Sequence, residues 1–541
     1  MKDISSTGSF VDFTLENFIY VDKTVYIPQL VKLKRVFISR PRRFGKSLTL
    51  DTIATLFETG VEPYFKGTWI YDKWTEPTYP VLRLNFLNFD KNSLEKFNNK
   101  LNSKITEFAE LNQVTTYKEK EETEDSIDHL LEQLRLEGRQ IVILIDEYDC
   151  QMTANINNES LYKQFQEKIK SIYANIKDKF AIKFLGITGV TRLKDVSIFS
   201  VGSDIRDITN SSAYSQMIGF TRDEIKKYYI DYLKLAASYE NNCTVDNVTE
   251  AQIESLLDRL AKNYDGYCFD EFYKKKVFST WSVNKFFQSV VSNKFVYFGE
   301  YWYDNGGLPS ILVNYLKTHE LNIFEYLDKD KFLKVSSDDF KNPTALTTIN
   351  QNVLMCQTGY LTLRSDLNKT STVALGIPNG EIYKALNRLL ANNIFKGNTD
   401  ITDDYGRSLL EVGTVDDIIN LFNSALNSVS YDNYPIVSES SVQNMLKLYL
   451  LGAHQEVLSE VHEAKGRADL VVNTDNRRIV FEFKYAKNEI DAKSKLLDAV
   501  EQIKTRDYGN ILPKKNELIR IAAVFNADPK VRAFTENQIV P

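Results

Sequence analysis

Short apolar runs alternate with longer amphipathic stretches through the first two hundred residues. Three runs rich in β-branched and aromatic residues predict buried strands, at residues 35–39, 140–145 and 181–187. Residues 81–86, where apolar positions mostly alternate, predict a fourth. Stretches with helical spacing at 46–58 and 92–112 separate these strands. Strands that alternate with helices predict an α/β fold with a mostly parallel sheet.

The pattern changes after about residue 215. Thr221 and Glu224 have capping-box spacing and predict a helix that continues through 225–235, and helical spacing then dominates to about 335. A second α/β pattern begins near residue 438, with helices at 439–451 and 491–505, strands at 456–461, 468–473 and 478–485, and a final strand at 518–525. We therefore expect four parts: an α/β core at 1–215, a helical segment at 216–340, a connector at 341–430, and an α/β domain at 431–541.

Composition limits the class of protein. Hydrophobic residues make up 43% and charged residues 26% of the chain, which is ordinary for a globular protein with sizeable cores. The net charge of −6 gives no bulk attraction for nucleic acid, so any such contact must be local. The four cysteines form no CxxC pair, which indicates free thiols in a reducing compartment. The four histidines have no metal-ligand spacing. No signal peptide or membrane-length apolar run is recognisable, so we expect a cytoplasmic location.

Residues 40–47 (RPRRFGKS) lie between the first predicted strand and the first predicted helix. A triphosphate needs backbone N–H groups, a helix N-terminus, an ammonium group and a hydroxyl that can bind Mg²⁺. Lys46 and Ser47 supply the last two, and Gly45 permits close backbone approach. The common GxxxxGK[ST] pattern has glycine where this chain has Arg40. The alternative is a basic surface turn that happens to contain Gly-Lys-Ser.

The predicted strand at 141–145 runs into Asp146 and Glu147. A carboxylate at the end of a buried strand can hold Mg²⁺, and the next one can polarise the attacking water. We therefore assign Asp146 to the metal and Glu147 to general-base catalysis. Thr188, at the end of the 181–187 strand, is either a sensor of the γ-phosphate or a plain strand-end threonine.

Together these motifs predict a P-loop ATPase core that uses ATP and Mg²⁺. The residues assigned to nucleotide binding are Arg42, Arg43, Phe44, Gly45, Lys46, Ser47, Leu48, Asp146 and Thr188. Ser47 and Asp146 are the predicted metal ligands.

Six segments resemble a family of prokaryotic AAA-ATPase-like proteins: 20–24 (YVDKT), 40–47, 146–149 (DEYD), 189–191 (GVT), 198–200 (IFS) and 264–267 (YDGY). In that family the RPRRFGKS loop is usual, so Arg40 is a family trait. The resemblance covers about residues 8–310. It implies an AAA-like fold and a C-terminal PD-(D/E)XK nuclease-like domain of the restriction-endonuclease type. Arginine fingers of AAA-type modules usually come from a neighbouring subunit, so the resemblance implies a homo-oligomer. Arg192, Arg206 and Arg222 are candidate fingers, and the alternative for each is an ordinary surface charge.

Carboxylates in the last domain fit that expectation. Asp469 begins one predicted strand, a turn follows at 474–476, and Glu482 and Lys484 point to the same face of the next strand. If the strands pair as a hairpin, Asp469 approaches Glu482. The two acids, helped by the Phe483 carbonyl, would then hold Mg²⁺, and Lys484 would orient water for phosphodiester hydrolysis. The alternative is a solvated Glu–Lys pair on an ordinary strand.

Other residues of this domain are weaker candidates for the site. Glu439 is a candidate for an additional ligand or for a contact to a metal-bound water, and Gln502 with Tyr508 resembles a helical Gln…Tyr feature of some nucleases of this superfamily. His454 and His462 are not expected to be ligands. The aromatic clusters at 264–269 and 301–303 could stack on bases, but core packing is the better interpretation because aromatics make up 12% of the whole chain.

The sequence therefore predicts an ATPase coupled to a Mg²⁺-dependent nuclease-like domain that acts on nucleic acid, DNA in preference to RNA. Two alternatives stay open. The nuclease-like domain could be an inactive binding module of a regulatory ATPase, or the chain could be a protein-remodelling ATPase with a partner-docking domain.

Overall fold

The computed structural model describes residues 1–176, 179–193, 204–304, 310–316, 319, 323–343, 345–395, 406–453, 455–463, 466–510 and 514–541. The chain divides into two compact units, one of residues 1–321 and 330–382 and the other of residues 322–329 and 383–541. The IFS segment at 198–200 and His454 lie outside the described residues.

A five-stranded sheet forms the centre of the first unit, in the order β2-β3-β4-β1-β5. All of its strand pairs are parallel. The strands are β1 (Arg35–Ser39), β2 (Val81–Asn85), β3 (Ile141–Asp146), β4 (Ile182–Gly189) and β5 (Arg206–Asp207). β3 is buried along its whole length, as expected for a parallel strand covered on both faces. Because β4 lies between β1 and β3, the residues at its carboxyl end lie between the ends of those two strands.

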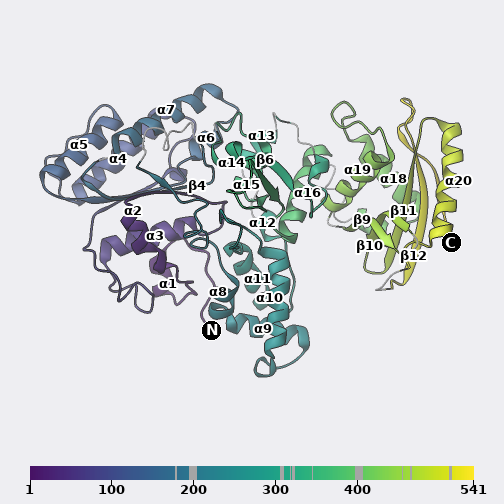
Figure 1. Ribbon diagram of the computed structural model, residues 1–541, viewed down its shortest axis with the longest axis horizontal. Helices are drawn as coiled ribbons and strands as arrows, with labels where there is room; N and C mark the ends of the chain where they lie inside the picture. The colour runs from purple at the N-terminus through teal and green to yellow at the C-terminus, as the bar shows by residue number, and fades with distance from the viewer. Residues whose placement is uncertain are drawn as a thin grey trace. The chain divides into compact units, whose positions relative to one another are not determined.

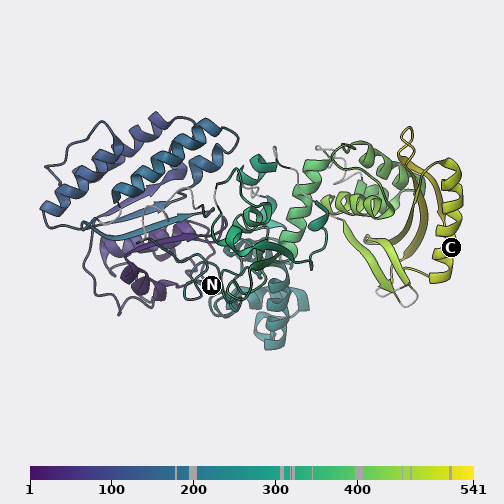
Figure 2. The ribbon, with the colours of Figure 1, turned by 45° about the horizontal axis from the view of Figure 1, so that its top comes forward.

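Helices cover both faces of this sheet. They are α1 (Phe10–Leu15), α2 (Ile27–Leu33), α3 (Lys46–Thr59), α4 (Leu94–Leu111), α5 (Thr123–Leu136), α6 (Cys150–Ala154) and α7 (Glu159–Ile176). α1, α2 and α3 lie on one side and α4, α5 and α7 on the other (Figures 1 and 2). The α4 and α5 sequences have the amphipathic spacing that buries one face of each helix, including Phe97 and Leu130.

The helical segment of the first unit contains α8 (Arg222–Tyr228), α9 (Ile230–Asn241), α10 (Glu250–Tyr264), α11 (Thr280–Asn293) and α12 (Tyr301–Asp304). Thr221 and Glu224 form the predicted capping box. The prediction of one continuous helix through 225–235 is wrong, because the chain leaves helical geometry at Tyr229, between α8 and α9. The core of this segment also takes in Ile19 and Val21 from the N-terminal region.

The rest of the first unit contains a small sheet of order β6-β8-β7. Its elements are α13 (Ser310–Leu316), β6 (Leu333–Ser336), α14 (Ser337–Lys341), α15 (Gln351–Gln357), β7 (Thr362–Leu363) and β8 (Thr372–Gly376). The helix α16 (Gly380–Ile394) follows it and runs into the second unit, which takes the residues of this helix from Tyr383 onward.

The second unit is built on a mixed sheet of order β13-β12-β11-β10-β9. Its strands are β9 (Glu456–Glu463), β10 (Gly466–Asn473), β11 (Arg477–Ala486), β12 (Glu517–Asn526) and β13 (Ala533–Ile539). Its other helices are α17 (Arg407–Val412), α18 (Val415–Asn427), α19 (Glu439–Gly452) and α20 (Glu489–Arg506). The expectation that 518–525 is the final strand is wrong, because β13 pairs antiparallel with β12.

α18 and α19 cover one side of this sheet and α20 the other (Figure 1). The alternation along β11 produces this arrangement, since Phe481 packs on Phe422 of α18 while Val480 packs in a cluster with Ile503 of α20. None of the described helices of either unit is long and apolar enough to cross a membrane.

Candidate functional site

The loop between β1 and α3 encloses one end of a pocket of about 490 Å³. Gly45 is the N-cap of α3 and has a φ of +99°, a backbone conformation that side chains disfavour. The amino end of a 14-residue helix therefore points at the pocket, with the positive end of its dipole. Gly45, Lys46, Ser47 and Leu48 all line the pocket.

Lys46 is almost completely buried beneath this loop, with 4% of its surface exposed. Its ammonium group donates to the carbonyl oxygens of Arg40, at 3.2 Å, and Pro41, at 3.3 Å. It also lies 3.3 Å from Oε1 of Glu147. The loop, the lysine and the acid at the end of β3 thus meet at one point.

Asp146 accepts two hydroxyl hydrogen bonds. Ser47 Oγ donates to Oδ2 at 2.6 Å, and Thr188 Oγ1 donates to Oδ1. The ends of β3 and β4 and the start of α3 therefore come together, as the order of the sheet requires. Hydroxyl and carboxylate oxygens are ligands that Mg²⁺ takes in proteins, so Ser47 and Asp146 fit that ion chemically.

Glu147 lines the same pocket and has a φ of +52°, in the left-handed region that few non-glycine residues occupy. The turn that follows it is fixed by the buried carboxylate of Asp149. Oδ2 of Asp149 accepts from the backbone N–H of Thr191 at 2.7 Å and from its hydroxyl at 2.6 Å. Asp149 thereby ties the segment after Glu147 to the segment after Thr188.

Arg40 takes no part in the pocket. Its guanidinium is buried, donates to the carbonyls of Ser39 and Thr209 at 2.8 and 2.6 Å, and lies 4.1 Å from the ring centre of Phe269. Burial lowers its pKa to about 9. Arg40 thus serves the packing of the loop, which explains how the chain uses an arginine where the common pattern has glycine.

The other predicted loop residues divide into two groups. Arg43 donates to the carbonyls of Tyr301 and Trp302 and lies over the ring of Trp281, while Phe44 is buried against Tyr267 and Trp302. These two side chains anchor the loop to the helical segment. Arg42 lines the pocket, and its guanidinium has no hydrogen-bond or ion-pair partner among the described residues.

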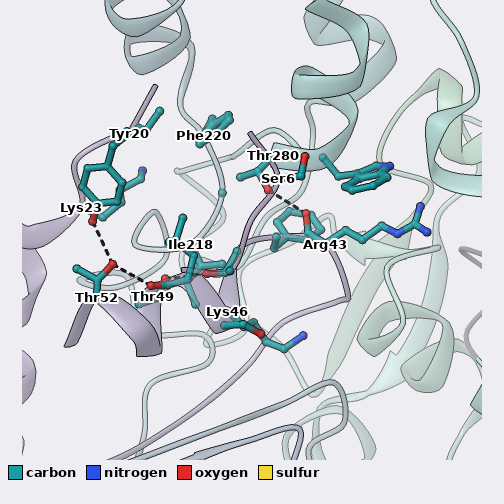
Figure 3. Close-up of a pocket in the computed structure, with 18 of the residues that line it drawn as sticks. Ser6, Tyr20, Lys23, Arg43, Lys46, Thr49, Thr52, Ile218, Phe220 and Thr280 are labelled. Atoms are coloured by element: carbon teal, nitrogen blue, oxygen red, sulfur yellow. Dashed lines mark hydrogen bonds between the residues drawn. The ribbon is translucent and has the colours of Figure 1, made fainter. Parts of the chain in front are cut away.

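The other end of the pocket is apolar, and it was missed in the sequence. Figure 3 shows Tyr20, Ile218 and Phe220 lining the cavity that contains Lys46. Tyr20 Oη lies 3.4 Å from Thr52 Oγ1. Further apolar residues complete this end: Phe13, Ile19, Val21, Ile27, Leu30 and Met217. The YVDKT segment at 20–24 was the available signal, although nothing in it pointed to an apolar pocket wall.

In the second unit the hairpin of β10 and β11 brings the predicted acids together. The last paired residues are Leu470 and Phe481, so Asp469 and Glu482 are the next residues outward on the two strands. Asp469 Oδ2 accepts from the backbone N–H of Phe483 at 2.9 Å. A role for the Phe483 carbonyl stays a prediction.

Glu482 is fully buried, and its two oxygens differ. Oε1 accepts from Lys484 Nζ at 2.9 Å, whereas Oε2 has no hydrogen-bond partner among the described residues. Burial, and then the charge of Asp469, raise the pKa of Glu482 to about 7. Lys484 Nζ also lies 3.5 Å from Glu439 Oε1, so Glu439 on α19 reaches the same cluster.

A buried carboxylate oxygen without a partner is costly unless something else binds it. The described residues contain no group of three or more His, Cys, Asp or Glu side chains arranged as a metal site. The pair of Asp469 and Glu482 nonetheless offers hard oxygen donors, which fits Mg²⁺ chemically. The Gln502 amide donates to Tyr508 Oη at 3.4 Å, so these two residues also contact each other.

Other candidates have local partners. Arg192 forms an ion pair with Asp207, and Arg222 forms ion pairs with Glu254 and Asp258, while Arg206 lies in the short strand β5. The expected core packing of the aromatic clusters is confirmed for Tyr264, Tyr267 and Trp302, which are at most 2% exposed.

Comparisons with known proteins agree with this layout. Residues 5–199 match the family described as a predicted AAA-ATPase, and residues 437–535 match the PD-(D/E)XK nuclease superfamily. The chain is 26% identical over 534 residues to an uncharacterized protein in the vnfD 5′ region of Azotobacter chroococcum mcd 1, covering 95% of this chain and 94% of that protein.

Among solved structures, Cdc6p from Pyrobaculum aerophilum is 11% identical and matches 68% of this chain and 91% of its own. The TM-score of 0.22 is too low for this likeness to carry any inference. The family matches carry the comparison: residues 5–199 are similar to the family described as a predicted AAA-ATPase, and residues 437–535 are similar to the PD-(D/E)XK nuclease superfamily.

Proposed function

We propose that this protein binds and hydrolyses ATP in the first unit and cleaves nucleic acid in the second. The observation that carries the first half is the convergence of Lys46, Ser47 and Asp146 on one pocket, with a 2.6 Å hydrogen bond between the last two. The β- and γ-phosphates would lie against the amino end of α3, where backbone N–H groups and Lys46 bind them. The adenine ring of ATP would occupy the apolar end of the pocket, beside Tyr20 and Phe220.

Glu147 is the proposed general base. Its carboxylate now pairs with Lys46, and the phosphates of ATP would compete for that ammonium group. Once released, Glu147 can accept a proton from the water that attacks the γ-phosphorus, while Thr188 can donate to a γ-phosphate oxygen. Mg²⁺ bound by Ser47 and Asp146 would neutralise charge on the phosphates.

For the second unit we propose phosphodiester hydrolysis. The support is the buried carboxylate of Glu482, whose Oε2 has no hydrogen-bond partner among the described residues. Glu482 and Asp469 are the first residues beyond the paired part of the β10–β11 hairpin. Mg²⁺ bound there would act as a Lewis acid and activate water. Lys484, held by Glu482 at 2.9 Å, would orient the water or stabilise negative charge on the phosphate. We propose DNA rather than RNA as the substrate.

Coupling between the two activities and assembly into a homo-oligomer complete the proposal. We propose that ATP turnover acts through the helical segment, because Arg43 of the phosphate loop donates to the backbone of Tyr301 and Trp302. A homo-oligomer would allow a neighbouring subunit to supply the arginine finger.

The test measures ATP turnover and plasmid cleavage in Mg²⁺ on one preparation of the full chain, beside Lys46→Ala and Asp469→Ala. We expect Lys46→Ala to lose ATP turnover and Asp469→Ala to lose cleavage while it still hydrolyses ATP. Cleavage that survives Asp469→Ala and Glu482→Ala would refute the nuclease site. ATP turnover without any cleavage by the native protein would instead support an inactive binding module.

A further inference from the structure

The carboxyl end of α20 carries a cluster of polar side chains that the proposed chemistry leaves unused. Arg506, the last residue of the helix, donates from Nη1 to Tyr508 Oη at 3.0 Å. Gln502, one turn earlier, donates to the same oxygen at 3.4 Å. Tyr508 is completely buried in the core between α20 and the sheet, so its hydroxyl is a fixed acceptor that holds the half-buried Arg506 in place.

A glycine on β10 makes room for this arginine. A Cβ atom on Gly466 would lie 2.5 Å from Cδ of Arg506, closer than carbon atoms can approach. The aliphatic part of Arg506 therefore lies directly on the start of β10. Asp469 follows three residues later on the same strand. Arg506 is thus positioned by the hydroxyl of Tyr508 on one side and by the backbone of Gly466 on the other.

The positive charge of Arg506 lies near the carboxylates of the site but is not neutralised by an ion pair with them. Its guanidinium interacts electrostatically with Glu482 and Asp469, but it makes no ion pair with either one among the described residues. A guanidinium has five N–H donors, and the described part of the chain gives this one a single hydrogen bond, to Tyr508. Donors therefore remain for a ligand that brings its own negative charge.

We propose that Arg506 binds a backbone phosphate of the nucleic acid next to the bond that the Asp469–Glu482 site cleaves. A planar guanidinium suits this role because two of its N–H groups can bind two phosphate oxygens at once. Tyr508 positions the guanidinium of Arg506, and Gly466 leaves space for the aliphatic part of that side chain. This inference rests on the proposed nuclease function, since it adds a contact to a neighbouring phosphate beside the groups proposed to act at the cleaved bond.

The experiment measures binding of fluorescein-labelled duplex DNA to the full chain by anisotropy, with Ca²⁺ in place of Mg²⁺ to prevent cleavage. Each protein is titrated over a range of salt concentrations, because every phosphate contact contributes about 0.9 to the slope of log K against log salt. The variants are Arg506→Ala, Arg506→Lys and Tyr508→Phe. Lys504→Ala is the matched control, since Lys504 is an exposed cation on the same helix.

We expect Arg506→Ala to weaken binding roughly tenfold to a hundredfold and to reduce the salt slope by about one. Arg506→Lys keeps the charge and should recover part of the affinity. Tyr508→Phe should cause a smaller loss with nearly unchanged slope. If Arg506→Ala folds normally by circular dichroism and has the same DNA affinity and salt slope as Lys504→Ala, the inference is overturned.

The outcomes for the native protein separate this inference from the proposed function. A native protein that binds DNA in Ca²⁺ but does not cleave it in Mg²⁺ refutes the nuclease activity, and the Arg506 comparison still stands or falls on binding alone. A native protein that binds neither duplex nor single-stranded DNA refutes both. Binding of RNA alone, with the same dependence on Arg506, supports the phosphate contact and corrects the proposed substrate.

Discussion

The ammonium nitrogen of Lys46 lies 3.3 Å from Oε1 of Glu147, so the cation proposed to bind phosphate forms an ion pair with the proposed general base. Both groups line the same pocket, and only one is needed by the triphosphate. Under the proposed function, ATP binding would exchange one anionic partner of Lys46 for another. This exchange would place a free carboxylate beside the γ-phosphate only when ATP is bound.

Glu147→Gln should separate binding from hydrolysis. The amide cannot accept a proton, so we expect ATP turnover to fall by about 10²- to 10⁴-fold. ATP affinity should be retained or slightly improved, because the competing anion is gone. Turnover and equilibrium binding of a fluorescent ATP analogue measure the two effects. Glu110→Gln, an exposed glutamate of α4, is the control, and hydrolysis by Glu147→Gln at the native rate would show that another group is the base.

Asp146→Asn should remove the benefit of Mg²⁺ for ATP binding. Asp146 accepts from both Ser47 and Thr188, and the amide keeps the shape but loses the charge. We expect the affinity for ATP in Mg²⁺ to fall roughly tenfold or more, toward the affinity measured in excess chelator. Titration of ATP binding at several Mg²⁺ concentrations tests this. An unchanged Mg²⁺ dependence would place the metal elsewhere.

Arg40→Gly restores the glycine of the common phosphate-loop pattern, yet we expect it to destabilise the protein. The change leaves the buried carbonyls of Ser39 and Thr209 without their donor. The free energy of unfolding of the first unit should fall by about 2–4 kcal/mol. Arg42→Gly is the matched control, with the same change in backbone freedom but no lost partner. Urea unfolding compares the two variants, and equal stability would argue against a structural role for Arg40.

Glu381 is a buried acid whose ionisation should oppose folding. It accepts from Ser282 Oγ at 2.7 Å and from the backbone N–H of Trp302 at 2.9 Å. Burial raises its pKa to about 8, with Glu300 as the nearby charge that adds to the shift. The folded chain thus holds a proton that the unfolded chain releases near pH 4.5. The free energy of unfolding should therefore decrease as pH rises from about 5 to about 8.

Glu381→Gln should remove this component of the pH dependence. The amide can still accept both hydrogen bonds, so the variant should resemble the native protein near pH 5 and exceed its stability by up to a few kcal/mol near pH 8. Urea unfolding across this pH range measures the difference. A native protein and variant with parallel profiles would show that Glu381 does not titrate between these limits.

Lys484→Met should abolish cleavage while metal binding persists. The lysine contacts Glu482 and Glu439 but would not itself be a metal ligand. We expect the cleavage rate to drop on the order of a hundredfold or more, as for loss of a group that assists proton transfer. Calorimetric titration with Mn²⁺ should still show binding, in contrast to Asp469→Ala. Normal cleavage by Lys484→Met would remove the lysine from the mechanism.

The acid pair of the second unit could be predicted because its geometry is local. Thr474 donates to the carbonyl of Arg477 at 2.9 Å and closes the turn, and the turn then sets the register of β10 against β11. With side chains alternating along each strand, Asp469 and Glu482 have to meet on one face. The strand ends at Asp146 and Thr188 follow from the same alternation of strands and helices.

What could not be predicted depends on contacts between distant segments. The apolar end of the proposed nucleotide pocket exists because residues 13–21 and residues 217–220 line one cavity. The hydrophobic periodicity of the sequence gives no sign that these two segments come together. The helix break at Tyr229 has the same origin. Its ring is buried against Phe287 and its hydroxyl donates to Asn284, and this packing overrides a sequence that is helical on both sides.

The chain passes between its two compact units three times, after residues 321, 329 and 382. The segment 322–329 is held in the second unit, where Leu327 accepts a hydrogen bond from Tyr383 at 2.9 Å. No single cut can therefore separate all residues of one compact unit from all residues of the other. A truncation after residue 321 would strip residues 330–382, including Glu381, from the first unit, so a shortened chain that keeps this unit whole has to extend to residue 382.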